Sequence, residues 1–337
     1  MKAIGYVESL PAADARALFD FDAPSPTLQP RDLLVRVKAI SVNPADTHIR
    51  KRQAGAPDAP AILGWDVAGV VEAVGPEARL FKPGDEVFYA GSVVRPGANS
   101  ELHAVDERIV GPKPRTLSFA EAAALPLTTI TAWEALFDRL QIPAGEASAG
   151  GALLIIGAGG GVGSIAVQLA RRLTGQTVIG TASRPETRAW VEERGAHHVI
   201  DHSKPLSQEL KRIGINAVDR IFSLTHTDHH WPEIVEAIAP QGRICIIDRV
   251  GGLDMLPLMS KSVSFSWEFM FTRSMFQTAD MEAQHRLLGE ASRLVDNGVI
   301  TTTLGEHFGA INAANLRRAH AAIESNQSIG KIVLEGF

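Results

Sequence analysis

The 337-residue sequence predicts an α/β protein in which a doubly wound parallel sheet stands beside a second, β-rich domain. The first observation is an apolar run at residues 153–156 that meets four glycines within five residues and then becomes amphipathic. The second is a repeated alternation of strand-like and helix-like segments over residues 128–268, which is typical of a parallel sheet. The third is the sequence pattern of residues 1–127, where short β-rich runs alternate with Pro and Gly turns.

The glycine-rich turn predicts a nucleotide-binding strand, turn and helix. Residues 152–156 form a buried-strand pattern, and from residue 162 onward the apolar positions recur at helical spacing. Ala158, Gly160 and Gly163 fill the three positions of a G-x-G-x-x-G fingerprint, with Ala in the first. On such a turn, backbone N–H groups approach a pyrophosphate at the positive end of the helix dipole. The predicted cofactor contacts here are Ala158, Gly160, Gly161, Val162 and Gly163.

The uncharged stretch at residues 147–170 is also long enough for a membrane helix. Four glycines would badly weaken such a helix, and strand-helix alternation continues after it. We expect strands at residues 177–181, 197–200, 218–224 and 243–247, and helices at residues 185–193, 206–212 and 232–238. Leu224 and Ile247 lie at strand ends, on the carboxyl edge where dinucleotides bind, and are predicted cofactor contacts.

The end of the second strand indicates which dinucleotide binds. An Asp or Glu about 20 residues beyond the glycines would hold the ribose 2′-hydroxyl of NAD. This chain has Ser183 and Arg184 there instead, which can donate hydrogen bonds to a 2′-phosphate. We therefore predict NADP(H). The alternative is that Arg184 and Arg188 are solvated side chains at a helix start.

Composition favours a soluble enzyme. The net charge of −5, with 45% hydrophobic and 21% charged residues, gives no sign of a nucleic-acid partner. No secretory signal is visible near the first residue, so we expect no membrane association and a cytoplasmic location. The single cysteine, Cys245, excludes an internal disulfide and lies in an apolar strand pattern, which indicates core packing rather than a nucleophile.

The first 127 residues predict a mostly antiparallel or barrel-like domain. Runs at residues 33–40 and 67–74 have strand character and are separated by turn residues. Six segments then resemble the medium-chain dehydrogenases over nearly the whole chain. They are SVNPAD at 41–46, GWDVAGVV at 64–71, KPGD at 82–85, AAALP at 122–126, the glycine turn, and GKIVL at 330–334.

Within that family the sequence is most similar to the zinc-free quinone oxidoreductase branch, which includes relatives labelled zinc-type alcohol dehydrogenase-like. The resemblance implies a Rossmann dinucleotide-binding domain at residues 128–268. It also implies a GroES-like catalytic domain built from residues 1–127 and 269–337. By the same resemblance we expect a homodimer through the last strand of the Rossmann sheet, around residues 263–267.

Zinc chemistry separates the branches of the family. Zinc-dependent members carry Cys where this chain has Asn43, and Gly-His-Glu where it has Gly64, Trp65 and Asp66. An amide and an indole cannot replace thiolate and imidazole as zinc ligands, and a four-cysteine structural site is excluded by the cysteine count. We therefore predict no metal. Two histidine groups, at residues 226–230 and at 197, 198 and 202, are alternatives, but Thr227 or Asp228 fits better as a helix cap.

Without zinc, the expected chemistry is hydride transfer to an acceptor that is already electrophilic, namely a quinone or an α,β-unsaturated carbonyl. By resemblance, Asn43 lies beside the nicotinamide and presents an amide donor, and Asp46 orders that loop. His48 is the nearest candidate proton donor, although family members often have Tyr there. Thr131 and Lys331 are further predicted cofactor contacts, with helix packing and a surface position as their alternatives.

Two other functions remain open. One is a zinc-free reductase or dehydrogenase of simple aldehydes, ketones or alcohols. The other is a non-catalytic NADPH-binding sensor or structural protein, which is favoured by the lack of an unmistakable acid or base. Turnover separates this last class from the two enzymes, and the type of acceptor separates the enzymes from each other.

Overall fold

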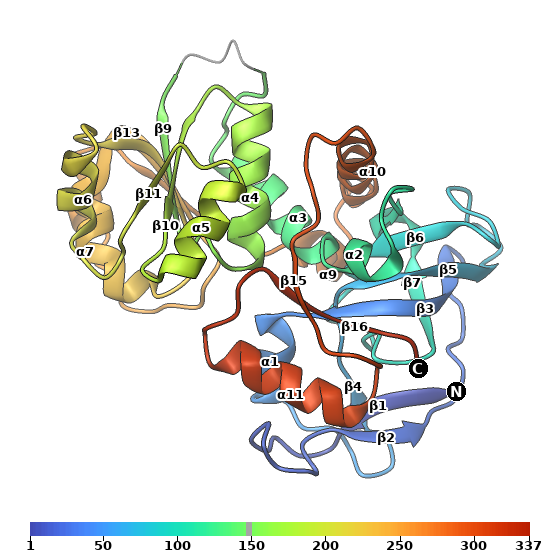
Figure 1. The fold of residues 1–337 in the computed structure, drawn as a ribbon. Coiled ribbons are helices and arrows are strands. Elements are labelled where there is room, and N and C mark those ends of the chain that lie inside the picture. The colour runs from blue at the N-terminus through green and yellow to red at the C-terminus, as the bar shows by residue number, and fades with distance from the viewer. Residues whose placement is uncertain (146–149) are drawn as a thin grey trace. The chain divides into compact units, whose positions relative to one another are not determined.

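A computed structural model describes residues 1–145 and 150–337 (Figure 1). The chain forms two compact units, Met1–Ile130 with Phe271–Phe337, and Thr131–Met270. The sequence placed the boundaries after residue 127 and before residue 269. Among the described residues, no helix has both the length and the apolarity needed to cross a membrane. Residues 147–149 of the alternative membrane segment lie outside the described part.

The second unit contains a six-stranded parallel sheet with the order β11-β10-β9-β12-β13-β14. Counted along the chain, this is the 3-2-1-4-5-6 order of a doubly wound dinucleotide-binding fold. The predicted fold class is therefore confirmed. The strands are β9 (Ala152–Ile156), β10 (Thr177–Thr181), β11 (His198–Ile200), β12 (Val218–Ser223), β13 (Ile238–Ile246) and β14 (Ser264–Trp267).

Helices cover both faces of this sheet. Figure 1 shows α4 and α5 on one face and α6 and α7 on the other. Their bounds are α4 (Gly161–Leu173), α5 (Pro185–Glu193), α6 (Leu206–Arg212) and α7 (Thr227–Ala237). The short α8 (Leu256–Met259) precedes β14, and α3 (Pro126–Trp133) runs into a π-helix, η2 (Glu134–Arg139). Leu154, Ile179, Ile221 and Ile244, from four neighbouring strands, belong to one buried core cluster with Ile234 of α7.

One helix starts earlier than the sequence indicated. The prediction placed it at residues 232–238 with a cap from Thr227 or Asp228, whereas α7 begins at Thr227. The cap comes from Asp248, just after β13. Its carboxylate accepts the Thr227 N–H at 2.9 Å and the Thr227 hydroxyl at 2.6 Å. A carboxylate at a helix N-terminus satisfies exposed backbone donors and the helix dipole together, so the predicted cap was wrong.

The first unit is built mainly on antiparallel pairs, as predicted. Its larger sheet has the order β15-β16-β3-β5-β6-β8, with β7 also paired to β3. Only the β15–β16 pair of this sheet is parallel in the described part of the chain. The strands are β3 (Asp32–Val42), β5 (Val67–Val74), β6 (Glu86–Tyr89), β7 (Leu102–Asp106), β8 (Val110–Pro112), β15 (Leu304–His307) and β16 (Lys331–Glu335). A smaller sheet joins β1 (Lys2–Tyr6), β2 (Phe19–Asp22) and β4 (Ala61–Ile62).

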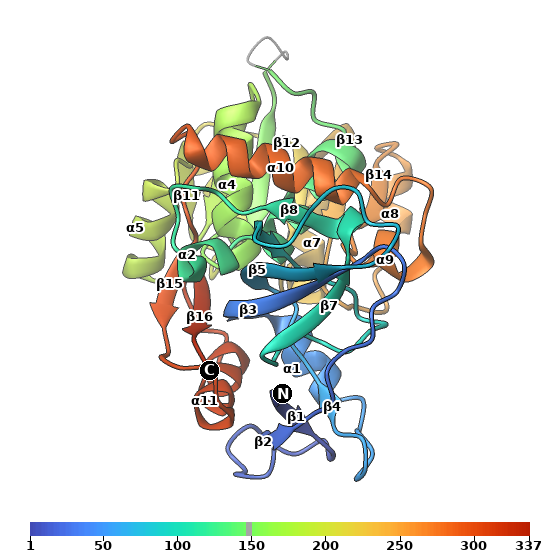
Figure 2. The same ribbon diagram turned by 90° about the vertical axis from the view of Figure 1, so that its right-hand side faces the viewer.

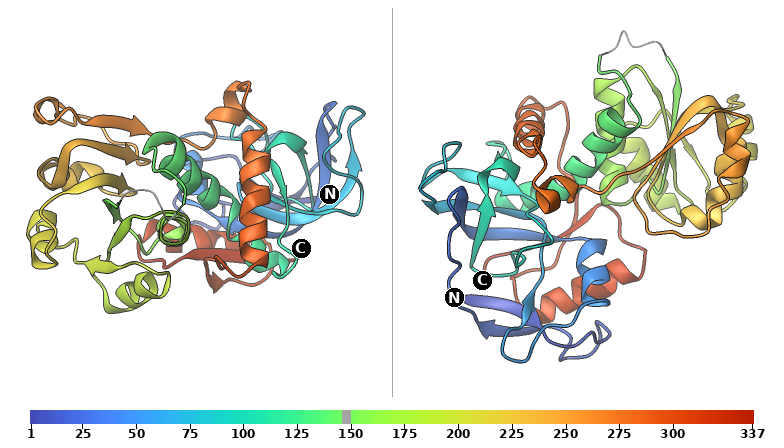
Figure 3. Two further views of the ribbon diagram at one scale, coloured as in Figure 1. Left: turned by 90° about the horizontal axis from the view of Figure 1, so that it is seen from above. Right: turned by 180° about the vertical axis from the view of Figure 1, so that it is seen from behind.

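The C-terminal segment returns to this first unit. In Figure 2, α10 (Ala283–Asp296) lies along β8, and in Figure 3 α11 (Ala313–Glu324) lies beside α1 (Pro44–Arg50). Fully buried Arg50 joins α1 to α11, because it donates to His320 Nδ1 at 3.2 Å and to Glu324 Oε1 at 2.6 Å. The remaining helices of this unit are η1 (Glu107–Ile109), α2 (Phe119–Ala123) and α9 (Thr272–Phe276).

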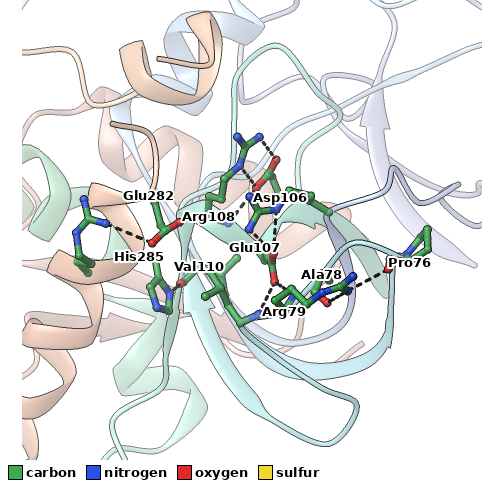
Figure 4. Close-up of polar contacts among 12 residues, drawn as sticks. Pro76, Ala78, Arg79, Asp106, Glu107, Arg108, Val110, Glu282 and His285 are labelled. Atoms are coloured by element: carbon green, nitrogen blue, oxygen red, sulfur yellow. Dashed lines mark hydrogen bonds and ion pairs between the residues drawn. The ribbon is translucent and has the colours of Figure 1, made fainter. Parts of the chain in front are cut away.

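A buried carboxylate holds the loop before β6. Glu107 is fully buried and accepts from Arg31 at 2.7 Å and from the backbone N–H groups of Arg79 and Leu80, each at 2.7 Å (Figure 4). Figure 4 also shows His285 of α10 against the carbonyl of Val110, a contact of 2.7 Å. These polar groups have partners within the scaffold, so we assign them to stability and not to chemistry.

Candidate functional site

The first unit contains a buried polar cluster made of Asn43, Asp46, Asp66 and Lys331. Asn43 follows β3 and precedes α1, Asp66 precedes β5, and Lys331 begins β16. Each of the four residues is at most 3% exposed. Buried charges are stable only when they are paired and hydrogen-bonded, so the four side chains must satisfy one another within the fold. The sequence singled out three of its members, and the structure adds Asp66.

The Asn43 amide is fully engaged by the protein. Its Nδ2 donates to Asp66 Oδ2 at 2.8 Å and to the carbonyl of Trp65 at 3.2 Å. Its Oδ1 accepts from the ammonium group of Lys331. The expected role, in which the amide donates to the acceptor oxygen, would need donors that these contacts already use. Asn43 therefore joins the cluster together, and its place beside the nicotinamide stays a prediction.

Lys331 and Asp66 form a buried ion pair. The Lys331 Nζ lies 2.8 Å from Asp66 Oδ2 and 3.1 Å from the carbonyl of Val42. The other Asp66 oxygen accepts the N–H of Leu127 at 2.7 Å. Burial raises the pKa of Asp66, and the Lys331 charge opposes that rise. The Lys331 ammonium group donates to Val42, Asn43 and Asp66. This excludes the alternative that Lys331 is a surface residue. Its contact with the cofactor stays a prediction.

Asp46 orders the loop as the sequence suggested. Its carboxylate accepts the backbone N–H of Asn43 at 2.7 Å, which fixes the start of α1. Burial raises the pKa of Asp46 to about 7, with the Asp66 charge adding to the rise and Lys331 opposing it. His48, two residues further along α1, is exposed and lies outside this cluster. Its role as a proton donor stays a prediction.

The donor set of the cluster does not fit a catalytic zinc ion. Zinc takes three protein ligands of thiolate, imidazole or carboxylate type, and here Asn43 and Trp65 stand where zinc-dependent members carry Cys and His. The Trp65 indole N–H donates to the carbonyl of Ser92 at 3.3 Å. The Asn43 and Asp66 oxygens that remain both bind the Lys331 ammonium group.

In the second unit, the glycine turn has the geometry of a phosphate cradle. A Cβ at Gly163 would lie 2.5 Å from Ala158 Cα, so helix α4 approaches the turn more closely than any side chain permits. At Gly160, the N-cap of α4, a Cβ would come no nearer than 3.8 Å to Gly157 O. Gly161 and Val162 form the half-exposed first turn of α4. This open N-terminus fits a pyrophosphate.

The end of β10 carries the residues that were predicted to choose the cofactor. Ser183 is exposed, and half-buried Arg184 is the N-cap residue of α5, 3.7 Å from Glu186. Arg188, the other arginine, donates to the carbonyl of Val199 at 3.0 Å and so has a structural partner. No Asp or Glu stands at residues 181–185, at the end of β10.

His202 lies near this edge, and the sequence did not assign it to the cofactor site. The Thr181 hydroxyl accepts the Gly157 N–H at 3.0 Å and lies 2.9 Å from His202 Nδ1. If the hydroxyl donates to Nδ1, the neutral imidazole keeps its proton on Nε2. Burial lowers the pKa of His202. The spacing of His202 after β11 was the available signal, but it was weighed only as a metal ligand.

The other predicted contacts lie where the sheet places them. Leu224 and Ile247 are half-buried and directly follow β12 and β13. Thr131 is buried within α3. Cys245 is fully buried in β13, and burial raises the pKa of its thiol to about 12, which fits core packing. Within the described residues, no group of three or more His, Cys, Asp or Glu side chains is arranged to hold a metal ion.

Comparison with known proteins defines the class. Residues 29–131 match the alcohol dehydrogenase GroES-like domain, and residues 194–334 match the zinc-binding dehydrogenase domain. The chain therefore belongs to the medium-chain dehydrogenase/reductase family.

Within that family, the chain is similar to proteins of at least two kinds. A zinc-type alcohol dehydrogenase-like protein of Staphylococcus aureus strain MSSA476 is 41% identical over 99% of both chains. The quinone oxidoreductase of Rattus norvegicus is 30% identical over 93% of this chain and 92% of its own. Among solved structures, a Rhizobium etli CFN 42 protein with a provisional zinc-dependent alcohol dehydrogenase name has a TM-score of 0.95 at 55% identity, covering 100% of this chain and 98% of its own. Escherichia coli quinone oxidoreductase complexed with NADPH has a TM-score of 0.83 at 25% identity, covering 99% and 100%.

Proposed function

We propose that this protein is an NADPH-dependent oxidoreductase that transfers hydride to a quinone or an α,β-unsaturated carbonyl compound without zinc. The observation that carries the proposal is the Lys331 ammonium group, which binds the oxygens of Asn43 and Asp66. Asn43 stands where zinc-dependent relatives carry Cys, and Asp66 directly follows Trp65, which stands where they carry His. The chain thus supplies its own cation to this cluster, and an acceptor has to be electrophilic without help from a metal.

The second unit supplies the binding groups for the cofactor. A bound nicotinamide cofactor provides the hydride. The first turn of α4, from Gly161 to Gly163, offers backbone donors to a pyrophosphate. Ser183 and Arg184 at the end of β10, with the imidazole of His202, would bind a ribose 2′-phosphate. The NADPH complex of the Escherichia coli relative supports this choice.

The remaining chemistry is the stabilisation and protonation of the acceptor oxygen. Hydride addition leaves negative charge on the acceptor oxygen, and that oxygen takes a proton from water or from exposed His48. A dry pocket and fixed hydrogen-bond donors would stabilise the charge as it develops. An acceptor of this kind differs from a simple aldehyde or ketone, which in the zinc-dependent branch is polarised by the metal.

The direct test is a panel of acceptors with purified, untagged protein. NADPH oxidation is followed at neutral pH with 9,10-phenanthrenequinone, an enone and a simple aldehyde, each with and without a chelator. The proposal expects turnover of the quinone or the enone that the chelator leaves unchanged. Preference for the aldehyde would favour a simple carbonyl reductase, and NADPH binding without any turnover would favour a sensor.

We also propose a homodimer formed through the edge of the parallel sheet. Strand β14 is the last strand in the sheet order, so one of its edges has no neighbour among the described strands. Trp267 and Phe269 at its end are 59% and 50% exposed. Exposed aromatic side chains beside an unpaired strand edge favour pairing with another chain.

A further inference from the structure

Four histidines lie together at the carboxyl edge of the parallel sheet. His202 follows β11, while His226, His229 and His230 lie before and within the first turn of α7, after β12. The ring centroids of His202 and His230 are 6.1 Å apart, and those of His229 and His230 are 5.0 Å apart. His226 is close enough to act on the titration of both His202 and His230. The cluster therefore joins two loops at the edge where dinucleotides bind in this fold.

One threonine links His202 to the glycine turn. The hydroxyl of Thr181, the last residue of β10, lies 2.9 Å from His202 Nδ1 and accepts the N–H of Gly157 at 3.0 Å. Ser183 and Arg184, which are proposed to bind the 2′-phosphate, follow directly along the chain. Within the described residues, the second ring nitrogen of His202, Nε2, makes no hydrogen bond. This nitrogen is the one left to bind a ligand.

The His202 ring is uncharged at neutral pH. Burial lowers the pKa of His202, and charges on His226 and Arg184 add to this effect, while Asp201 opposes it. His230, which is 8% exposed, lies against the same ring. Burial and the neighbouring imidazoles lower the pKa of His230 to about 4. Neither ring therefore carries a charge before a ligand binds.

The permanent charges around the two rings cancel. The charged groups are Arg184, Glu186, Arg188, Asp201, Lys204 and Asp228. Three of these are cations and three are carboxylates. Arg184 lies 3.7 Å from Glu186, and Lys204 lies 3.8 Å from Asp201. Asp248 already caps α7. A 2′-phosphate brings about 1.5–2 negative charges at neutral pH, and these groups leave that charge unbalanced.

We propose that His202 is a proton-dependent ligand of the cofactor 2′-phosphate, neutral in the free protein and charged in the NADPH complex. The proton comes from solvent when the cofactor binds and returns to solvent when it leaves. Both ring nitrogens of the charged imidazole donate, Nδ1 to the Thr181 hydroxyl and Nε2 to a phosphate oxygen. This inference rests on the proposed function and adds its regulation, because the preference for NADPH over NADH increases as pH falls from about 8 to about 6.

Proton uptake on binding tests the inference without turnover. Isothermal titration calorimetry measures the binding of 2′,5′-ADP, the part of NADPH that carries the 2′-phosphate, at neutral pH in PIPES and in imidazole buffer. The change of binding enthalpy with the ionisation enthalpy of the buffer gives the number of protons taken up. We expect about 0.5 proton or more for 2′,5′-ADP and none for 5′-AMP, which lacks the 2′-phosphate. The phosphate has a pKa of about 6 and can only release a proton when it binds cations, so it cannot mimic uptake.

Two substitutions separate the charge of His202 from its shape. His202→Gln keeps a polar partner for Thr181 but takes up no proton, and we expect it to bind 2′,5′-ADP about ten-fold more weakly and 5′-AMP normally. His202→Arg carries a permanent charge, so it is expected to bind 2′,5′-ADP tightly without proton uptake.

The matched control is His198→Gln. His198 begins β11, at the opposite edge of the sheet, so this variant should take up protons as the wild type does. Thermal melts check that each variant is folded, and 5′-AMP binding checks that the rest of the site is intact.

The failure of this inference differs from the failure of the proposed function. If 2′,5′-ADP binds wild-type protein no more tightly than 5′-AMP, the NADPH preference fails and the role of His202 fails with it. If 2′,5′-ADP binds more tightly without proton uptake, or if His202→Gln keeps the uptake, the assignment of His202 alone is wrong. Uptake by the wild type and His198→Gln, with none in either His202 variant, supports the inference.

Discussion

Residues far apart in the sequence meet in the buried polar cluster. Lys331 contacts Asn43 across 288 positions and Asp66 across 265. The motifs around Asn43 and Lys331 marked both residues as important, but neither spacing nor periodicity could show that they touch. For the same reason the sequence assigned the Asn43 amide to a ligand, whereas in the structure its donors bind Trp65 and Asp66.

Removing the buried cation tests this cluster. Lys331→Met keeps the length of the side chain but leaves the Asp66 carboxylate buried without a counter-charge. Breaking a buried pair in this way costs about 3–5 kcal/mol. We expect a corresponding loss in the free energy of unfolding by urea, and partial recovery in the double variant with Asp66→Asn. Equal stability of Lys331→Met and wild-type protein would contradict the pairing.

Asp46 makes a pH-dependent contribution. Its pKa of about 7 in the folded protein is above its ordinary value of 3.8, so the folded state binds the proton more tightly than the unfolded state. Stability from this group is therefore present at low pH and is lost as pH rises from about 4 to about 7. Asp46→Asn removes the titration and keeps an acceptor for the Asn43 N–H. The stability of the variant relative to wild-type protein should rise across that interval in urea titrations, and parallel profiles would disprove the assignment.

At the scale of elements, the sequence predicted the bounds of a helix or strand well where neighbouring residues determine them. The bounds of β10, α5 and α6 agree with the sequence, because Pro at the first turn of α5 and the alternation of buried positions are local signals. The start of α7 could not be found in this way. Its N-terminus is held by Asp248, 21 positions along the chain, which only the parallel pairing of β12 with β13 brings near.

The two glycines of the cofactor turn should respond differently to the same change. Gly163→Ala forces a methyl group against the Ala158 backbone, and overpacking of this kind costs about 1–3 kcal/mol. Gly160→Ala makes only an ordinary van der Waals contact, 3.8 Å from Gly157 O, so we expect near-normal stability but weaker NADPH binding, because the methyl group occupies the approach of the pyrophosphate. Thermal melts and NADPH titrations measure both effects. Equal loss of stability in the two variants would contradict the described geometry.

At the scale of the molecule, the sequence predicted the parallel sheet from its alternation. The family resemblance predicted that the C-terminal segment returns to the first unit, and 271–337 lies there. Composition and periodicity could not predict the pairing of β16 with β3, because this contact joins the two ends of the chain.

The proposed dimer makes a prediction about assembly. Trp267→Glu places a charge beside the edge of β14 and should convert a dimer to a monomer in size-exclusion chromatography with light scattering. Phe276→Glu is a matched control, because Phe276 is 69% exposed in the other unit, and it should leave the mass unchanged. A wild-type monomer, or a dimer that survives Trp267→Glu, would show that this edge is not the interface.

The most direct test of NADPH-dependent, metal-free hydride transfer is the ratio of kcat/KM for NADPH over NADH. It is measured with 9,10-phenanthrenequinone on chelator-treated protein, for the wild type and for Arg184→Ala. We expect the wild type to prefer NADPH by more than about ten-fold, which is the effect of about one charge-assisted hydrogen bond. Arg184→Ala should lose most of this preference. A preference for NADH, or activity that the chelator abolishes and zinc restores, would contradict the proposed function.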